Sequence, residues 1–196
     1  MVIGSSFVTT QTTTRATLED LYRVEGKAEL IRGRIVEIMR SGDLPTEVTA
    51  NIYVSLRAFA KSTGRGVAKT DGTTFAVDEL PSGRESFAPD AAYHLGPRPV
   101  NRMKYFKGAP TFAVEARSEF DYGRAAEIEI EMEEKREDYF AAGTLVVWDV
   151  DPKAETIAVF RPDAPTTPVV FRRSEIADAE PAVPGWRMAV DQVFAG

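Results

Sequence analysis

Two short apolar segments on either side of a long helical stretch most constrain the fold of this chain. Residues 111–116 (TFAVEA) and 145–150 (LVVWDV) have the length and apolar content of buried strands. Residues 121–142 between them form the longest predicted helix, and Gly143 follows where a helix commonly ends. Buried strands that alternate with helices are typical of α/β architecture. We therefore predict an α/β (α+β-like) domain with a mixed β-sheet flanked by helices.

The rest of the chain supplies shorter elements compatible with that sheet. We predict a helix over residues 17–24 with Thr17 as N-cap, and a second helix from Pro45 to just before Gly64. A hairpin is expected over 29–39 with its turn at Arg32-Gly33, and strands are expected within 67–77 and 87–95. A terminal hairpin is expected from 156–160 and 169–171, with Pro162 and Pro165 in its loop. No internal repeat or linker interrupts this order, so we predict one domain over residues 16–196, with a C-terminal β-hairpin. The Ser/Thr/Gln-rich residues 1–15 are expected to form a flexible tail.

Composition excludes several classes of site. The chain has no cysteine, which excludes disulfides, thiolate ligands and cysteine nucleophiles, and which fits a cytoplasmic protein. Its single histidine, His94, is too few for a histidine-cluster zinc site and argues against Ser-His-Asp catalysis. The net charge of −6 has the wrong sign for a protein that coats nucleic acid. A DNA partner would require a local basic patch, a metal ion or a second subunit.

Two acids occupy positions in or beside predicted strands. Asp90 follows Pro89 in the strand-like run 87–95, and Glu115 interrupts an apolar strand in which Phe112 and Val114 share the opposite face. A buried carboxylate must be paired, hydrogen-bonded or bound to a metal. Two carboxylates that converge from neighbouring strands would make an oxygen-rich Mg²⁺ site. The plainer alternative is a pair of strand-end acids that meet solvent or an arginine.

Lys135 lies in the apolar stripe of the long predicted helix. At about 100° per residue, it falls on the same face as Met132 and Tyr139. Lysine is seldom buried without a partner, so it should meet an acid of the sheet. Its role there is either structural, as a salt bridge, or functional, in orienting or deprotonating an attacking water. Both roles place Lys135 beside one of the two strand acids.

Pro89-Asp90, followed by Glu115 and then a lysine, resembles the PD-(D/E)XK nuclease superfamily. More narrowly, the chain is similar to the Uma-type restriction endonuclease family. The segments that carry this resemblance run in family order over about residues 17–160: ELIRGRIV (29–36), APD (88–90), VEARS (114–118), KREDYFAAG (135–143) and WDVDP (148–152). The resemblance implies a restriction-endonuclease-like fold.

The resemblance also implies chemistry at particular positions. Asp90 and Glu115 would hold Mg²⁺ or Mn²⁺, with Glu29 as a further metal-binding acid that acts through a water. Lys135 would supply the signature lysine, because the position two residues after the acid holds Arg117, which stays protonated and cannot act as a base. The implied function is Mg²⁺-dependent hydrolysis of DNA phosphodiester bonds by a homodimer. A catalytically inactive interaction module with the same fold is the alternative, and RNA or another phosphodiester is not excluded as substrate.

Other residues offer weaker signals. The Pro/Gly-containing stretch with Arg98, Arg102, Lys104 and Lys107 is the best local candidate for DNA contact, although an ordinary solvated loop has the same composition. His94 could touch substrate, but a surface or strand-end histidine is the simpler interpretation. The acidic run 127–138 is expected to be the solvated face of a helix.

Overall fold

The computed structural model describes residues 15–39 and 41–196, so the predicted N-terminal tail lies outside the described residues except for Arg15. A mixed sheet with strand order β11-β10-β9-β8-β6-β3 forms the centre of the molecule. Only β8 and β9 run parallel to each other, and every other neighbouring pair in this sheet is antiparallel. The predicted α/β class with a mixed sheet is confirmed.

The bounds of the elements are as follows. The strands are β1 (Ala28–Ile31), β2 (Arg34–Glu37), β3 (Val67–Thr70), β4 (Phe75–Ala76), β5 (Ser86–Phe87), β6 (Ala91–His94), β7 (Phe106–Lys107), β8 (Phe112–Ala116), β9 (Val146–Asp151), β10 (Thr156–Arg161), β11 (Ala164–Phe171), β12 (Ile176–Asp178) and β13 (Arg187–Ala189). The helices are α1 (Leu18–Leu21), α2 (Asp43–Thr63), α3 (Glu119–Gly123), α4 (Ala125–Ala141) and α5 (Val190–Val193).

Helices cover both faces of the sheet, and the alternation of β8 decides which side chain meets which helix. Phe112 and Val114 pack in the larger core cluster with the buried face of α2. Ala113 points the other way and packs in a second cluster with Tyr139 of α4. Glu115 continues the Ala113 face. The sheet therefore directs this carboxylate toward α4, as the alternation predicts.

The helix predicted for residues 121–142 is wrong in one respect, because the structure divides it. Ser118 begins α3 through a capping box with Asp121, and Arg124 leaves the helical conformation at φ −131° and ψ 36° before α4 begins. Two helices therefore replace one, and α2, with 21 residues, is longer than α4, with 17. The prediction that α2 ends before Gly64 is confirmed, since Gly64 adopts a left-handed conformation at φ 66°.

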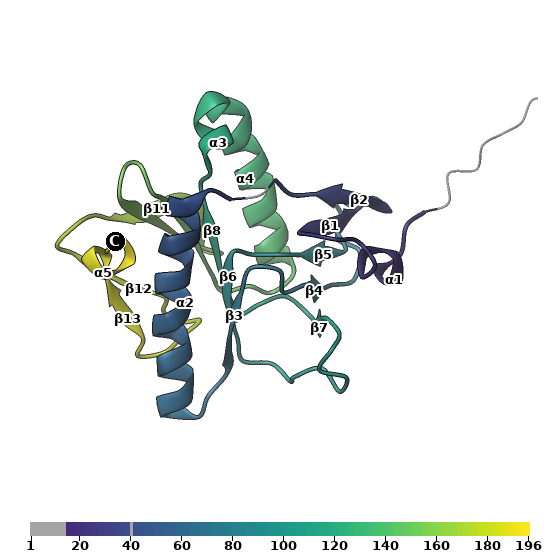
Figure 1. Cartoon of the computed structure of the whole chain (residues 1–196), viewed down its shortest axis with the longest axis horizontal. Coiled ribbons are helices and arrows are strands. Elements are labelled where there is room, and N and C mark those ends of the chain that lie inside the picture. Colours follow the sequence, from purple (N-terminus) through teal and green to yellow (C-terminus); the bar gives the residue numbers. More distant parts are fainter. Residues whose placement is uncertain (1–14, 40) are drawn as a thin grey trace, which may run out of the picture.

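The β1–β2 hairpin and the helix before it form as predicted. Thr17 caps α1 in a reciprocal pair with Asp20, although α1 ends at Leu21 and not near residue 24. Gly33 turns the hairpin at φ 65°, and the backbone of Ile31 pairs with Arg34 across it. This hairpin, α1 and the small β5-β4-β7 sheet lie together on one side of the molecule (Figure 1).

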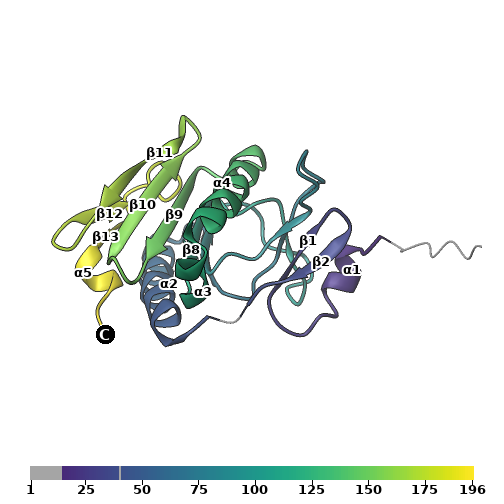
Figure 2. The same cartoon turned by 90° about the horizontal axis from the view of Figure 1, so that it is seen from above.

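The predicted terminal hairpin forms from β10 and β11 but does not end the fold. The pair β12–β13 and helix α5 follow it, and Trp186 and Val190 from this segment pack into the α2-side core. Pro165 lies within β11 and not in the loop; a proline is tolerated there because β11 is an edge strand. Seen from above, the C-terminal elements lie at the opposite end of the molecule from β1–β2 (Figure 2). Within residues 15–39 and 41–196, no helix combines the length and apolar character needed to cross a membrane.

Candidate active site

A cavity of about 910 Å³ brings the predicted site residues together. Its lining includes Asp90, Glu115 and Lys135, together with Glu29. These side chains come from the segment before β6, from β8, from α4 and from β1 respectively. The parts of the chain that meet here are far apart in the sequence, so the cavity exists only in the folded protein.

Asp90 is fixed to the backbone on both sides of Glu115. The Asp90 N–H donates to the Val114 carbonyl at 3.0 Å, and Asp90 Oδ2 accepts the Ala116 N–H at 2.8 Å. Its other oxygen, Oδ1, accepts a short hydrogen bond from the Lys27 ammonium. The proline-aspartate step therefore delivers one carboxylate directly beside the strand that carries the other.

Glu115 forms its contacts through one oxygen. Glu115 Oε1 lies 2.8 Å from Lys135 Nζ and accepts the Tyr139 hydroxyl at 2.7 Å. Burial raises the pKa of Glu115; Lys135 opposes this shift, and the neighbouring Asp90 reinforces it. Among the described residues, no donor binds Glu115 Oε2. One carboxylate oxygen thus remains available to a ligand in the cavity.

Lys135 lies between two carboxylates on the inward face of α4. Its Nζ atom is 3.1 Å from Glu29 Oε1 as well as 2.8 Å from Glu115 Oε1. Burial alone would lower the pKa of Lys135, but Glu115 and Glu29 outweigh it and raise the pKa. The side chain is therefore an ammonium in this state. Tyr139 follows one turn later and donates to the same glutamate.

Glu29 is buried, and both of its carboxylate oxygens accept hydrogen bonds from protein donors. Its Oε1 accepts the Ala88 N–H at 2.9 Å, and its Oε2 accepts a short hydrogen bond from Arg84. Burial acts to raise the pKa of Glu29, yet Lys135 and Arg84 outweigh it and lower the pKa to about 2. Both oxygens are thus occupied by protein donors, which makes Glu29 the anchor for Lys135 and Arg84.

Sequence reasoning missed two cations in the cavity. Lys27 lies between Asp90 and Asp71, 2.9 Å from Asp71 Oδ1. Arg84 joins Glu29 to Asp138, with its Nε 2.8 Å from Asp138 Oδ2. The position of Lys27 two residues before Glu29 was an available signal, because residues two apart in an extended segment share a face.

Comparisons with known proteins identify the family and the fold of this chain. Residues 16–191 match the model of the Uma2 family, whose description is "Putative restriction endonuclease". The chain belongs to this family. Its structure is similar to the crystal structure of a protein from Anabaena variabilis that is described as a putative nuclease belonging to DUF820. The TM-score is 0.70 and the sequence identity is 17%, and the match covers 91% of this chain and 97% of the other. At that identity the likeness shows the fold alone, and no curated protein matches the sequence. Family and fold together support a nuclease.

Arg117 occupies the place where the simplest superfamily pattern has its lysine. In this Uma2 chain the Arg117 guanidinium turns to the buried Asp149, with Nη2 3.1 Å from Asp149 Oδ2. It also lies 2.9 Å from Glu129. Burial raises the pKa of Asp149, and the contacts with Arg117 oppose that shift. The Arg117 guanidinium thus neutralises the Asp149 carboxylate on the neighbouring strand β9, whereas Lys135 is the cation that contacts Glu115.

Asp90 and Glu115 face the same cavity and carry carboxylate oxygens of the kind that a divalent cation binds. Because the Lys27 ammonium holds Asp90 Oδ1 and the Ala116 N–H holds Oδ2, a cation at Asp90 would have to displace Lys27. Within the described part of the chain, no three or more His, Asp or Glu side chains are arranged to hold a metal ion. Glu29 does not fit as a direct third ligand, since Ala88, Lys135 and Arg84 occupy its oxygens.

Other sequence interpretations have different outcomes. His94 is the last residue of β6, as the strand-end interpretation expects, but it is only 5% exposed and packs against Phe75 and Phe106, so it is not a surface residue. Trp148 is a fully buried core residue. The acidic run on α4 is largely solvated, but Asp138 is buried.

Proposed function

We propose that this chain is a metal-dependent nuclease that hydrolyses DNA phosphodiester bonds, with Asp90, Glu115 and Lys135 at its active site. The observation that carries the proposal is the meeting of two carboxylates and one ammonium in a single cavity. Asp90 and Glu115 would hold the cation, and Glu29 would position Lys135. A bound Mg²⁺ or Mn²⁺ would polarise the scissile phosphate and lower the pKa of the attacking water.

The remaining steps belong to the side chains of the chain itself. The Lys135 ammonium, held by two carboxylates, would orient the attacking water and stabilise negative charge that develops at phosphorus. A raised lysine pKa favours these roles over that of a general base. Tyr139 would hold the Glu115 carboxylate in place through its hydroxyl. A homodimer would set two such sites across a duplex, and the cysteine-free composition fits a cytoplasmic location.

Plasmid nicking tests this function. We expect the wild type to nick supercoiled DNA with Mg²⁺ or Mn²⁺ and to stop when EDTA is added. Asp90→Asn and Lys135→Met should lose the activity while circular dichroism shows a folded chain. Glu133→Gln, on α4 outside the cavity lining, should behave like the wild type. Nicking by Asp90→Asn at the wild-type rate would refute the site.

A catalytically inactive module is the second candidate, and one observation favours it. Lys27 and Lys135 already neutralise the two carboxylates without a metal. Under this alternative the cations and acids are only a structural network. Calorimetry separates the two candidates, because the inactive module predicts no Mg²⁺ or Mn²⁺ binding by the wild type and no difference between wild type and Asp90→Asn.

A further inference from the structure

Positive charge is segregated in this acidic chain. Residues 48–70 and 91–114 contain eight Lys and Arg residues and no Asp or Glu, whereas the whole chain has a net charge of −6. Strands β3 and β6 belong to these two segments and pair with each other, so that Val67 lies opposite His94. The fold therefore brings two acid-free stretches side by side at one edge of the sheet.

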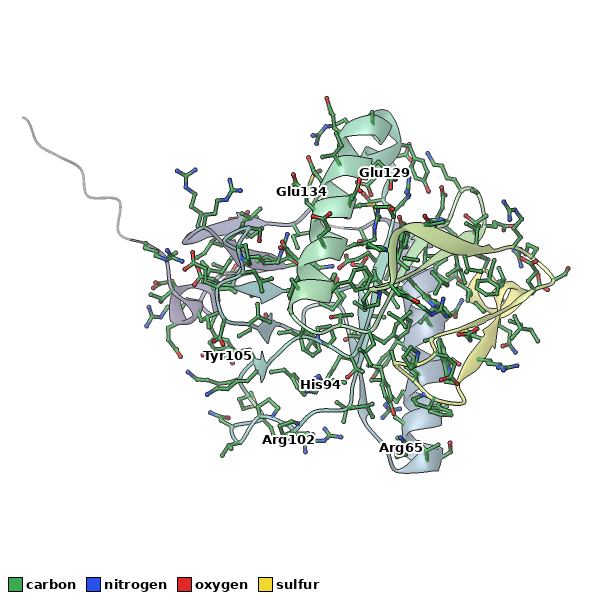
Figure 3. The ribbon with its side chains drawn as sticks, turned by 180° about the vertical axis from the view of Figure 1, so that it is seen from behind. Arg65, His94, Arg102, Tyr105, Glu129 and Glu134 are labelled. Carbon is green, nitrogen blue, oxygen red and sulfur yellow. The ribbon has the colours of Figure 1, made fainter. Side chains whose placement is uncertain are left out.

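A cavity of about 310 Å³ opens at this edge, between β3 and the loop that precedes β7. We call it the basic pocket and define it by the lysines, arginines and tyrosines that line it: Lys69, Arg98, Arg102, Lys104, Tyr22 and Tyr105. Among the described residues no acid lines it. Figure 3 shows Tyr105 and Arg102 on one side of the molecule, well away from Glu129 and Glu134 of α4.

The cations of the basic pocket are mostly unneutralised. Lys104 lies 2.7 Å from Glu19, but Lys69, Arg98 and Arg102 form no ion pair within the described part of the chain. Partial burial lowers the pKa of Lys69, and the nearby arginines lower it further. Cations that repel one another in a concave site are stabilised by a bound anion.

The lining suits a nucleic acid better than a simple anion. Arginine guanidinium groups can grip phosphate oxygens with two hydrogen bonds. The half-exposed Tyr22 and partly exposed Tyr105 offer aromatic faces on which bases can stack. The Tyr22 hydroxyl also donates to the Met103 carbonyl, and this hydrogen bond connects the loop before β7 to the segment after α1.

The basic pocket adjoins the candidate active site through one turn. Gly72, Thr73 and Thr74 line the basic pocket, and the preceding residue, Asp71, pairs with Lys27 in the larger cavity. Lys27 in turn contacts Asp90. Asp71 and Lys27 therefore link the wall of the basic pocket to Asp90.

We propose that the basic pocket binds the phosphate backbone of a DNA strand whose scissile bond lies at Asp90 and Glu115. This inference rests on the proposed function for the nature of the strand. It assigns substrate contact to Lys69, Arg98 and Arg102, the cations of the basic pocket that have no acidic partner among the described residues.

DNA binding without catalysis tests the proposal. The probe is a short fluorescein-labelled duplex, and anisotropy is measured with full-length protein in EDTA, so that cleavage cannot occur. The double variant Arg98→Gln/Arg102→Gln should weaken binding about tenfold at low salt and reduce the slope of log K against log salt by about two. Arg172→Gln/Arg187→Gln removes the same charge from exposed positions near the C-terminus and should bind like the wild type.

Three results would overturn the proposal: no binding by the wild type, wild-type binding by the Arg98/Arg102 variant, or equal weakening by both double variants. All four substituted arginines are exposed, and circular dichroism verifies that both variants fold. Lys69→Met is an independent single variant that should also weaken binding. A protein that binds DNA through the basic pocket but never nicks plasmid would refute the proposed function and the scissile bond at Asp90 and Glu115, and only the DNA-binding role of the basic pocket would stand. If the wild type nicks plasmid, and neither nicking nor binding changes in Arg98→Gln/Arg102→Gln, the proposed function would stand and the role of the basic pocket would be refuted.

Discussion

Replacement of Glu29 by glutamine should reveal how much the buried charge network stabilises the fold. The change is isosteric, and the amide oxygen can still accept the Ala88 N–H, so the variant chiefly removes the negative charge. The pKa of Glu29 falls from an ordinary 4.5 to about 2 in the folded protein. At about 1.4 kcal/mol per pKa unit, this corresponds to about 3 kcal/mol of unfolding free energy near neutral pH.

The pH dependence gives this prediction its sign. A carboxylate with a depressed folded-state pKa stabilises the fold above its unfolded pKa of 4.5 and loses that effect as the pH falls toward 2. The wild type loses this contribution in acid, whereas Glu29→Gln never has it. The gap between the two proteins should therefore shrink from about 3 kcal/mol near neutrality to about half of that at about pH 3.

Urea titration measures this gap directly. Trp148 and Trp186 are buried in the core, so their fluorescence reports on unfolding. We expect a lower urea midpoint for Glu29→Gln and a Tm reduced by about 10 °C at neutral pH. Glu37→Gln, at an exposed position of the same hairpin, is the matched control and should change little. A Glu29→Gln gap below about 0.5 kcal/mol, or one that stays constant with pH, would refute the reasoning.

Three further substitutions probe the same cavity. Tyr139→Phe removes the hydroxyl that donates to Glu115 and should cost about 1–3 kcal/mol in urea titration; unchanged stability would show that this contact is not needed. Arg84→Met leaves two buried carboxylates without their shared guanidinium, so we expect a loss of about 3–5 kcal/mol, and a variant as stable as the wild type would contradict that. Lys27→Met frees Asp90 from an ammonium. A charged hydrogen bond of about 1.5 kcal/mol corresponds to about tenfold tighter Mn²⁺ binding, measured by calorimetry; equal or weaker affinity would exclude competition by Lys27.

Much of the fold followed from local patterns. The periodicity of α2, its end at Gly64, the β1–β2 turn and the apolar strands β8 and β9 all depend on residues near one another in sequence. The break at Arg124 was not predicted, although Gly123 directly before it disfavours a helix interior. The segment after β11 was also missed, since β12, β13 and α5 are too short for periodicity to reveal.

The candidate site shows the same division. Strand alternation predicted that Glu115 faces α4, and the helical wheel predicted that Lys135 faces inward. The family resemblance singled out Asp90. Arg84 could not be found, because its role depends on a loop reaching Glu29 and Asp138 across the fold. Local sequence carries no signal for such a tertiary contact.

The most direct measurement of the central claim is a crystal structure of the chain grown or soaked with Mn²⁺, recorded at a wavelength that gives manganese anomalous signal. We expect an anomalous peak within bonding distance of Asp90 Oδ1 and Glu115 Oε2, with the Lys27 ammonium moved off Asp90 and Lys135 still against Glu115. Crystals that diffract well but show no manganese there, with Lys27 still bound to Asp90, would contradict the metal-dependent site.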